Sequence, residues 1–378
     1  MPELLEVMQD WDKFSTVRGK PVDEGAIAEA IDLLLNKRGY TSRMHAAILE
    51  EAITTTDFPY LFGQILDRQV LARYKMALPD WQSYFKVGTR KDFNAARLHK
   101  VQGNDGLLPL VPEKGEYLIA PMSESRYTIQ VYKRGRQFDI SWESVINDDL
   151  SAFSDIPNRF ADAATYTEAF LATSTYSSAA GPNAALFGTP IVDVDGQAVT
   201  NLGTLALTIP NLETTLELMQ AQTDVNGKPI TARGAHLVVP PALEFTARAI
   251  LTSALKMYTE SAGGALATLP MTNVIPQVGL KLHVDPLLPV IDASGNVNTT
   301  WYVFAEPSQL AAMEFDRLRG HETPEICMKA SDKVSTTGAP MSPFSGDFAT
   351  DNTFYRVRIV CGSAQLDPRA AYSQNGTT

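Results

Sequence analysis

The segment from Gly135 to Tyr176 limits most strongly what this chain can fold into. Phe138 and Ile140 alternate with polar residues, which predicts the end of a strand. The turn-forming Asn147-Asp148-Asp149 then interrupts the chain before a long helical pattern, which contains no Gly or Pro between Pro157 and Gly181. The segment therefore predicts a strand, a turn and one helix of about five or six turns, at about 154–177.

The apolar side of this predicted helix is narrow and made mostly of small residues. Ser154 or Asp155 is placed to cap its start, with Pro157 in the first turn. The apolar positions recur at steps of three and four residues: Phe160, Ala163, Ala164, Thr167, Phe170 and Leu171. Such a stripe favours close contact with a sheet, but it is also compatible with one amphipathic helix of an ordinary α+β enzyme.

Length and charge narrow the class of protein. A chain of 378 residues exceeds the size at which one hydrophobic core keeps growing, so we expect two or more lobes. The formal net charge of −11 argues against a protein that grips nucleic acid with its whole surface, so contact with DNA is expected to be weak or local. The acidic N-terminus and the lack of a long apolar window predict a cytoplasmic protein with no membrane contact.

Reactive residues form no catalytic pattern in the sequence. Cys327 and Cys361 are interpreted as small buried residues, because two cysteines cannot form a disulfide framework. Asp148-Asp149 is interpreted as turn and cap chemistry, and no phosphate loop, HExxH or GxSxG motif occurs. The histidines are scattered singly and are interpreted as packing or surface residues: His45, His99, His236, His283 and His321. We therefore expect no catalytic residue, cofactor or metal site.

A long basic excursion spans residues 81–137. Two strand-like legs, Tyr84–Phe93 and Tyr117–Tyr132, flank a turn at 102–106. An isolated two-stranded ribbon is marginal in water, so this hairpin needs a partner surface. Its basic residues are Arg90, Lys91, Arg97, Lys100, Arg126, Lys133, Arg134 and Arg136. They either protect solvated strand edges or contact an acidic patch on another subunit.

The second half of the chain predicts a mixed α/β lobe followed by more strands. In the lobe, Ala235–Val239 is a strand followed by a helix, and 261–264 is a flexible loop by composition. Strands at 278–284 and 301–304 are expected to form a hairpin around a turn at 292–296.

Further strands follow at 313–316, 326–328 and 355–361. They are expected to pack beside the strand that leads into the long helix. The tail YSQNGTT, at 372–378, is expected to be frayed.

Four words of the sequence, in their order and spacing, resemble tailed-bacteriophage major capsid proteins, in particular the Mu-like major head subunit group. They are TTTDFPYLF at 54–62, EKGEY at 113–117, VINDDLSAFSDIPNRFADAA at 145–164 and LVVPPALEFTARAIL at 237–251. The resemblance covers about residues 54–370.

The resemblance implies an α+β fold, the tailed-phage major capsid fold. Its expected parts are an N-terminal arm at 1–56, a peripheral (P) domain at 57–204 with an extended E-loop at about 82–136 and a spine helix at about 154–177, an axial (A) domain at 205–312, and returning P-domain strands and a tail at 313–378. Some members join subunits through a Lys–Asn bond, but no matched motif assigns this to Lys100 or Lys114 of the hairpin.

The function that the resemblance implies is that of a structural, non-enzymatic shell subunit. Such a subunit self-assembles into hexamers and pentamers of an icosahedral virion head around double-stranded DNA. A separate scaffolding protein, a portal and decoration proteins are the expected partners, with assembly in the host bacterial cytoplasm. The alternatives are an encapsulin-type compartment with the same fold and, from the composition, an α+β hydrolase.

Overall fold

The computed structural model describes residues 74, 80–102, 110–114, 116–117, 123–141, 156–225, 227–230, 232–262, 265–329, 331–334, 336 and 346–376. The predicted arm at 1–56, the turn at 147–149 and the helix cap at Ser154 or Asp155 lie outside these residues. The described chain divides into two compact units. The first takes Lys133–Thr167 and Gly320–Val360, and the second takes Pro79–Tyr132, Glu168–Arg319 and Cys361–Thr378.

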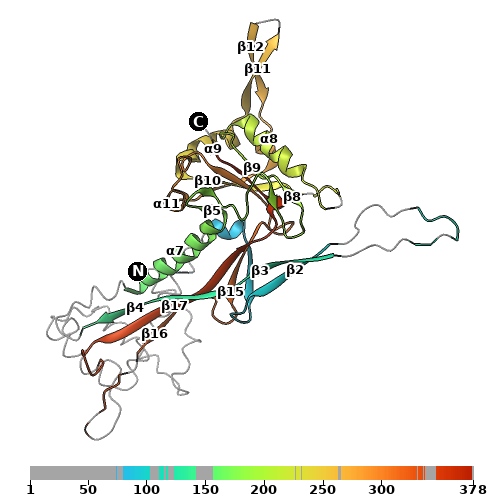
Figure 1. Cartoon of the computed structure of the whole chain (residues 1–378). Helices are drawn as coiled ribbons and strands as arrows, with labels where there is room; N and C mark the ends of the chain where they lie inside the picture. Colours follow the sequence, from blue (N-terminus) through green and yellow to red (C-terminus); the bar gives the residue numbers. More distant parts are fainter. Residues whose placement is uncertain are drawn as a thin grey trace, which may run out of the picture. The chain divides into compact units, whose positions relative to one another are not determined.

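The first unit is built around the N-terminal part of β17 (Thr353–Gln365), which pairs with β4 (Tyr132–Ile140) and, antiparallel, with β16 (Glu325–Met328) (Figure 1). The ring of Phe138 lies between those of Phe160 and Tyr355, with centroids 4.8 and 5.0 Å away. These contacts confirm the prediction that the C-terminal strand packs beside the strand leading into the long helix.

The second unit contains a first sheet in which the C-terminal part of β17 pairs antiparallel with β15 (Met313–Leu318). Strand β1 (Lys86–Arg90), which follows the short helix η2 (Asp80–Ser83), pairs parallel with β15. The prediction that 84–93 is one leg of the hairpin was therefore wrong. The hairpin consists of β2 (Ala96–Gln102) and β3 (Ser123–Ile129), because residues 91–95, with Asn94 hydrogen-bonded to Asp92, turn the chain between β1 and β2.

A second sheet of the same unit has the strand order β13-β10-β14-β18-β9. Its strands are β9 (Leu202–Gly203), β10 (Gly234–Val239), β13 (Lys281–Val284), β14 (Trp301–Ala305) and β18 (Ala371–Gln374). Strands β10 and β14 are almost entirely buried, as expected for a sheet covered on both faces. The predicted strand at 235–239 is thus confirmed.

Two predictions about this sheet were wrong. Strands β13 and β14 do not form a hairpin but lie on opposite sides of β10, because the chain between them includes helix α11 (Leu288–Ile291) and is long enough to cross one strand. Over residues 372–376 the tail is not frayed, since β18 is buried between β14 and β9, and Ser373 and Gln374 are 0% and 1% exposed.

Helix α8 (Ile209–Gln220) packs against this sheet with Leu212, Leu216 and Met219 buried. The sheet has a glycine at the contact: a Cβ on Gly234 would lie 2.6 Å from Leu216 Cδ2 and 2.7 Å from Val303 Cγ1. Any larger residue at position 234 would therefore push α8 away from the sheet.

Smaller elements complete the second unit. They are β5 (Ser177–Ser178), β6 (Gly181–Pro182), β7 (Ile191–Val192), β8 (Ala198–Val199), η3 (Pro241–Leu243), α9 (Glu244–Thr252), β11 (Leu255–Ala262), β12 (Ala265–Thr272), α10 (Ile275–Val278) and η5 (Pro368–Ala370). Of the loop predicted at 261–264, residues 261–262 belong instead to β11 of the β11–β12 ribbon, which projects from the second sheet (Figure 1), and 263–264 lie outside the described residues.

The long helix α7 (Ile156–Tyr176) has 21 residues, and its predicted position is confirmed. Its predicted stripe was only partly right: Ala164 is buried as predicted, but Ala163 and Phe170 are exposed, and Ala161, Glu168 and Ala172, which the stripe left out, are buried. A polar residue caused the error: Glu168 is fully buried because Arg317 Nε and Nη2 donate to its two carboxylate oxygens, at 2.9 and 2.8 Å.

Cys361 is buried as predicted, but the prediction was wrong for Cys327, which lies in β16 and is exposed. In the part of the chain that the structure describes, no helix is long and apolar enough to cross a membrane. No group of three or more His, Cys, Asp and Glu residues among the described positions is arranged to hold a metal ion.

Candidate intersubunit surface and its anchor

The β2–β3 hairpin has two chemically different faces. Residues that oppose each other across an antiparallel pair lie on the same face. The pairs Ala96–Ile129, Leu98–Tyr127 and Lys100–Ser125 form one face, and all six of their side chains are partly or fully buried. We call this the inner face.

The alternate positions of the same strands form the outer face, which we define as Arg97, His99, Glu124, Arg126 and Thr128. All five are exposed. Among the described side chains of this face, His99 contacts Glu124, and the two arginines are exposed to solvent. The outer face is therefore a solvated, predominantly basic strip.

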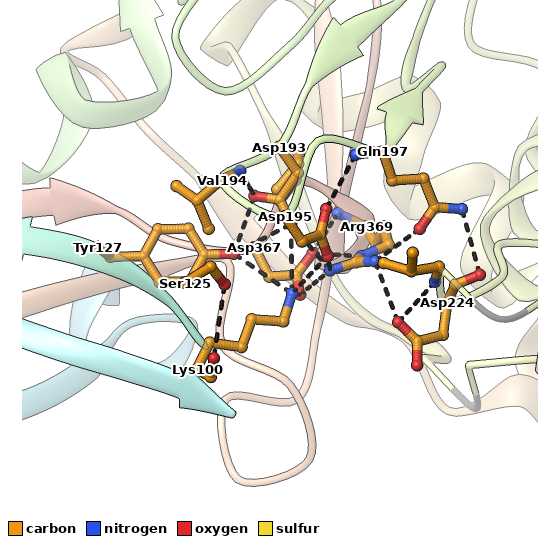
Figure 2. Close-up of polar contacts among 12 residues, drawn as sticks. Lys100, Ser125, Tyr127, Asp193, Val194, Asp195, Gln197, Asp224, Asp367 and Arg369 are labelled. Carbon is orange, nitrogen blue, oxygen red and sulfur yellow. Dashed lines mark hydrogen bonds and ion pairs between the residues drawn. The ribbon is translucent and has the colours of Figure 1, made fainter. Parts of the chain in front are cut away.

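Charged and polar groups beneath the inner face connect it to the rest of the second unit (Figure 2). We call this buried cluster the anchor: Lys100, Tyr127, Asp193, Asp195, Asp367 and Arg369. Lys100 Nζ lies 2.6 Å from Asp367 Oδ2, 3.2 Å from Asp193 Oδ2 and 3.4 Å from Asp195 Oδ2. The Tyr127 hydroxyl donates to Asp193 Oδ1 at 2.9 Å. Two residues of the hairpin thus reach three carboxylates of the body of the second unit.

Local turns of the chain place these carboxylates. Asp193 and Asp195 lie in the tight turn between β7 and β8, which Gly196 closes at a φ of +83°. The backbone N–H of Gln197 donates to Asp195 Oδ1 at 3.1 Å. Asp367 is the N-cap of η5 and accepts from the N–H of Arg369 at 3.1 Å.

Arg369 connects the carboxylates beneath the hairpin. Its Nη2 donates to Asp193 and Asp195 at 2.8 and 2.9 Å, and its Nε donates to Asp367 Oδ1 at 2.8 Å. Its Nη1 donates to Gln197 Oε1 at 2.9 Å. The Arg369 side chain is 1% exposed, so its charge depends on these partners.

The cluster determines the protonation of its members. Burial alone would lower the pKa of Lys100, but the charge of Asp367, its hydrogen bond with Lys100 and the charge of Asp193 together outweigh burial and raise this pKa. Burial would raise the pKa of Asp367, but the hydrogen bond from Arg369 and the charge of Lys100 lower it. Burial and the charge of Asp367 raise the pKa of Asp193. Lys100 is therefore a protonated ammonium group, which is a poor nucleophile for a covalent cross-link.

Arg90 makes a second set of intrachain contacts, at the strand before the hairpin. Its Nη2 donates to Glu314 Oε1 at 2.6 Å and its Nε donates to Asp316, and both carboxylates belong to β15. Gly88 leaves room for this arrangement, since a Cβ there would lie 2.4 Å from Asp316 Oδ1. These contacts join β1 to β15.

The eight basic residues predicted to contact another subunit thus divide into two groups. Arg90 and Lys100 have partners within the chain. The others are exposed: Lys91, Arg97 and Arg126 in the second unit, and Lys133, Arg134 and Arg136 on β4. Their role between subunits stays a prediction.

The sequence interpretation missed Asp193, Asp195, Asp367 and Arg369. A local signal existed, because the Asp-Val-Asp-Gly turn and the Asp-Pro-Arg cap each predict a carboxylate fixed by backbone N–H groups. Nothing local indicates that the two turns meet Lys100, because these residues are 93 to 267 positions apart.

The family described as phage capsid protein matches residues 126–374, which is more than half of the chain, and the chain belongs to this family. The chain is therefore a structural subunit of a virion shell, and it self-assembles into capsid shells. This confirms the expected family, its function as a major capsid protein and the α+β fold class.

Solved structures similar to the chain have low sequence identity. A chain of Mycobacterium phage Ogopogo is 12% identical, with 78% of this chain and 91% of that chain covered and a TM-score of 0.44. The capsid of a native GTA particle is 11% identical, with coverages of 80% and 92% and a TM-score of 0.47. The SrpI encapsulin of Synechococcus elongatus PCC 7942 is 11% identical, with coverages of 82% and 89% and a TM-score of 0.44. No curated protein sequence matches the chain.

Proposed function

We propose that the chain forms the hexamers and pentamers of an icosahedral head that encloses double-stranded DNA, and that the outer face of the β2–β3 hairpin contacts a neighbouring subunit. The two-faced hairpin carries this proposal. Its inner face is already occupied by its own chain through Lys100 and Tyr127, so only its outer face is free to bind another molecule.

The charge distribution favours another subunit over DNA as the partner of the outer face. The whole chain has a formal charge of −11, so a second copy offers acidic surface to Arg97 and Arg126. A shell whose subunits are acidic repels packaged DNA in bulk, so contact with DNA is weak or local. A heterologous contact of this kind, repeated around an axis, closes into a ring.

Our proposal for the other partners is supported by the family and by no contact of the described residues. A separate scaffolding protein, a portal and decoration proteins act with the chain, assembly takes place in the host bacterial cytoplasm, and the subunit has no enzymatic activity. The peripheral and axial domain assignments at 57–204 and 205–312 belong to the same proposal.

The test is imaging of the particles that contain the chain. Particles are purified from the producing cells, treated with nuclease and imaged by cryo-electron microscopy, and the protected contents are then extracted. Closed icosahedral shells with fivefold and sixfold capsomers and nuclease-resistant double-stranded DNA support the proposal. Shells that hold a protein cargo and no DNA indicate an encapsulin-type compartment. A small discrete oligomer with hydrolytic turnover overturns the shell assignment.

A further inference from the structure

Two histidines that the sequence places 47 residues apart form a direct pair in the second unit. His236 lies on β10 and His283 on the parallel neighbour β13, and His236 Nδ1 lies 2.9 Å from His283 Nε2. The outer nitrogens face carboxylates: His236 Nε2 lies 3.2 Å from Glu306 Oε2, and His283 Nδ1 lies 2.8 Å from Asp80 Oδ1. The expectation that the histidines are scattered singly was wrong for these two.

The number of protons in this row of four groups decides how many of its contacts are hydrogen bonds. Each of the three contacts needs one N–H group from an imidazole, because an ionised carboxylate has no proton to donate and can only accept a hydrogen bond. Two neutral imidazoles carry two N–H groups in total, so one contact must lack a proton. One additional proton satisfies all three contacts. A further proton would put two N–H groups face to face across the contact between His236 and His283.

The surroundings place the additional proton on His283. His236 is fully buried. Glu306, which faces His236, also has Lys281 Nζ at 3.5 Å from its Oε2. Burial, and then the charge of a protonated His283, lower the pKa of His236. His283 faces Asp80, whose side chain is 63% exposed and remains solvated. In this state His283 donates to Asp80 and to His236, and His236 donates to Glu306.

No other titratable side chain described in contact with the two rings competes for this proton. The Tyr84 ring lies against both imidazoles, with centroids 5.2 Å from His283 and 6.3 Å from His236. Burial and the charge of Asp285 raise the pKa of Tyr84 far above its ordinary range, so its phenol stays neutral. The charged groups around the pair are therefore Asp80, Glu306 and Lys281.

We propose that His236 and His283 share one proton, and that the resulting hydrogen bonds hold η2 against the second sheet. A second proton, taken up in acid, breaks this row of hydrogen bonds and releases η2. Asp80 is the first residue of η2, which leads through β1 into the β2–β3 hairpin. The pair thus makes the attachment of the segment before the hairpin dependent on pH. The attachment is strongest between the two proton steps, because loss of the first proton or gain of the second removes a hydrogen bond from the row.

The test is hydrogen exchange of the full-length subunit between pH 8 and pH 4.5, followed by mass spectrometry. Exchange at the imidazole C2 position reports the protonation of each histidine without any substitution. We expect the pair to take up its two protons in two separate steps, the second of them on His236, because the second proton puts two N–H groups face to face. Uptake of both protons in a single step overturns the proposal.

Backbone exchange of the peptide that contains residues 80–85 reports the release. After correction for intrinsic rates, wild-type protection is expected to peak at intermediate pH and to be lost in acid before β10 and β14 lose theirs. His283→Asn removes the shared proton and should abolish this peak, and the control His321→Asn, outside the hairpin and the histidine pair, should retain it. Equal pH profiles for wild type and His283→Asn, or simultaneous loss of protection in 80–85 and β14, overturn the proposal.

Discussion

Lys100 Nζ of the hairpin lies 2.6 Å from Asp367 Oδ2, near the C-terminus of the described chain. The contact joins residues 267 positions apart and leaves the exposed outer face of the hairpin as the side available to a neighbour. The anchor thus links the stability of the subunit to the position of the surface that we propose for assembly.

Lys100→Met should destabilise the subunit, because it keeps the aliphatic stem but leaves three buried carboxylates with Arg369 as their main cation. Removal of one partner of a buried pair costs about 3–5 kcal/mol, and the partial exposure of Lys100 places this change near the lower end. Urea unfolding of the unassembled subunit measures the effect. The matched control Arg97→Met, on the outer face, should change the free energy of unfolding by less than about 0.5 kcal/mol. Equal losses in both variants would contradict the anchor.

Two of the three carboxylates of the anchor, Asp367 and Asp193, should respond differently to neutralisation. The pKa of Asp367 is lowered in the fold, so its ionised form stabilises the subunit above its unfolded pKa of about 4, and this contribution is lost as the pH falls through the lower folded value. The pKa of Asp193 is raised, so its ionised form opposes folding, and that penalty disappears as the pH falls through the raised value. Asp367→Asn should therefore cost more stability at pH 7 than Asp193→Asn, in urea titrations of both variants. The reverse order would show that the two protonation states are assigned wrongly.

The buried pair of Glu168 and Arg317 should matter more than a similar pair on the surface. Glu168 is fully buried and accepts two hydrogen bonds from Arg317, so Glu168→Gln leaves a poorly compensated guanidinium and should cost about 3 kcal/mol. Glu213 makes a partly exposed pair with Lys256, and Glu213→Gln should cost at most about 1 kcal/mol. Thermal and urea unfolding of both variants measure the difference in stability loss. Equal losses would mean that the two hydrogen bonds from Arg317 to Glu168 add no stability.

Gly234→Ala tests the close approach of α8 to β10. Its Cβ would meet Leu216 and Val303 at under 3 Å, and overpacking of this kind costs about 1–3 kcal/mol. Gly295→Ala is the control, because a Cβ there has no atom within 4 Å. An unchanged unfolding midpoint for Gly234→Ala would mean that the helix shifts without cost.

Local patterns predicted the elements whose partners are close in sequence or whose burial is apolar. The helix at 156–176 and the strand at 234–239 were visible because their periods and their Pro and Gly boundaries are local. The buried side of the helix could not be predicted in the same way. Burial of Glu168 depends on hydrogen bonds from Arg317, which is 149 positions away. The pairing of β1 with β15 and the burial of β18 were missed for the same reason, because long-range pairing leaves no local periodicity.

Reversal of charge on the outer face separates assembly from folding. Arg97 and Arg126 have exposed side chains, so the double variant Arg97→Glu and Arg126→Glu should unfold within about 0.5 kcal/mol of wild type. It should nevertheless fail to form shells, because the acidic surface of a neighbouring copy would then repel the strip. Sedimentation and negative-stain electron microscopy of assembly reactions measure the result. The control Lys228→Glu with Arg233→Glu makes the same change in net charge at two exposed positions away from the hairpin, and it should assemble at a rate close to that of wild type. Normal shells from the hairpin variant would remove the outer face from the interface, whereas failure of both variants would show that net charge, and not the strip, limits assembly.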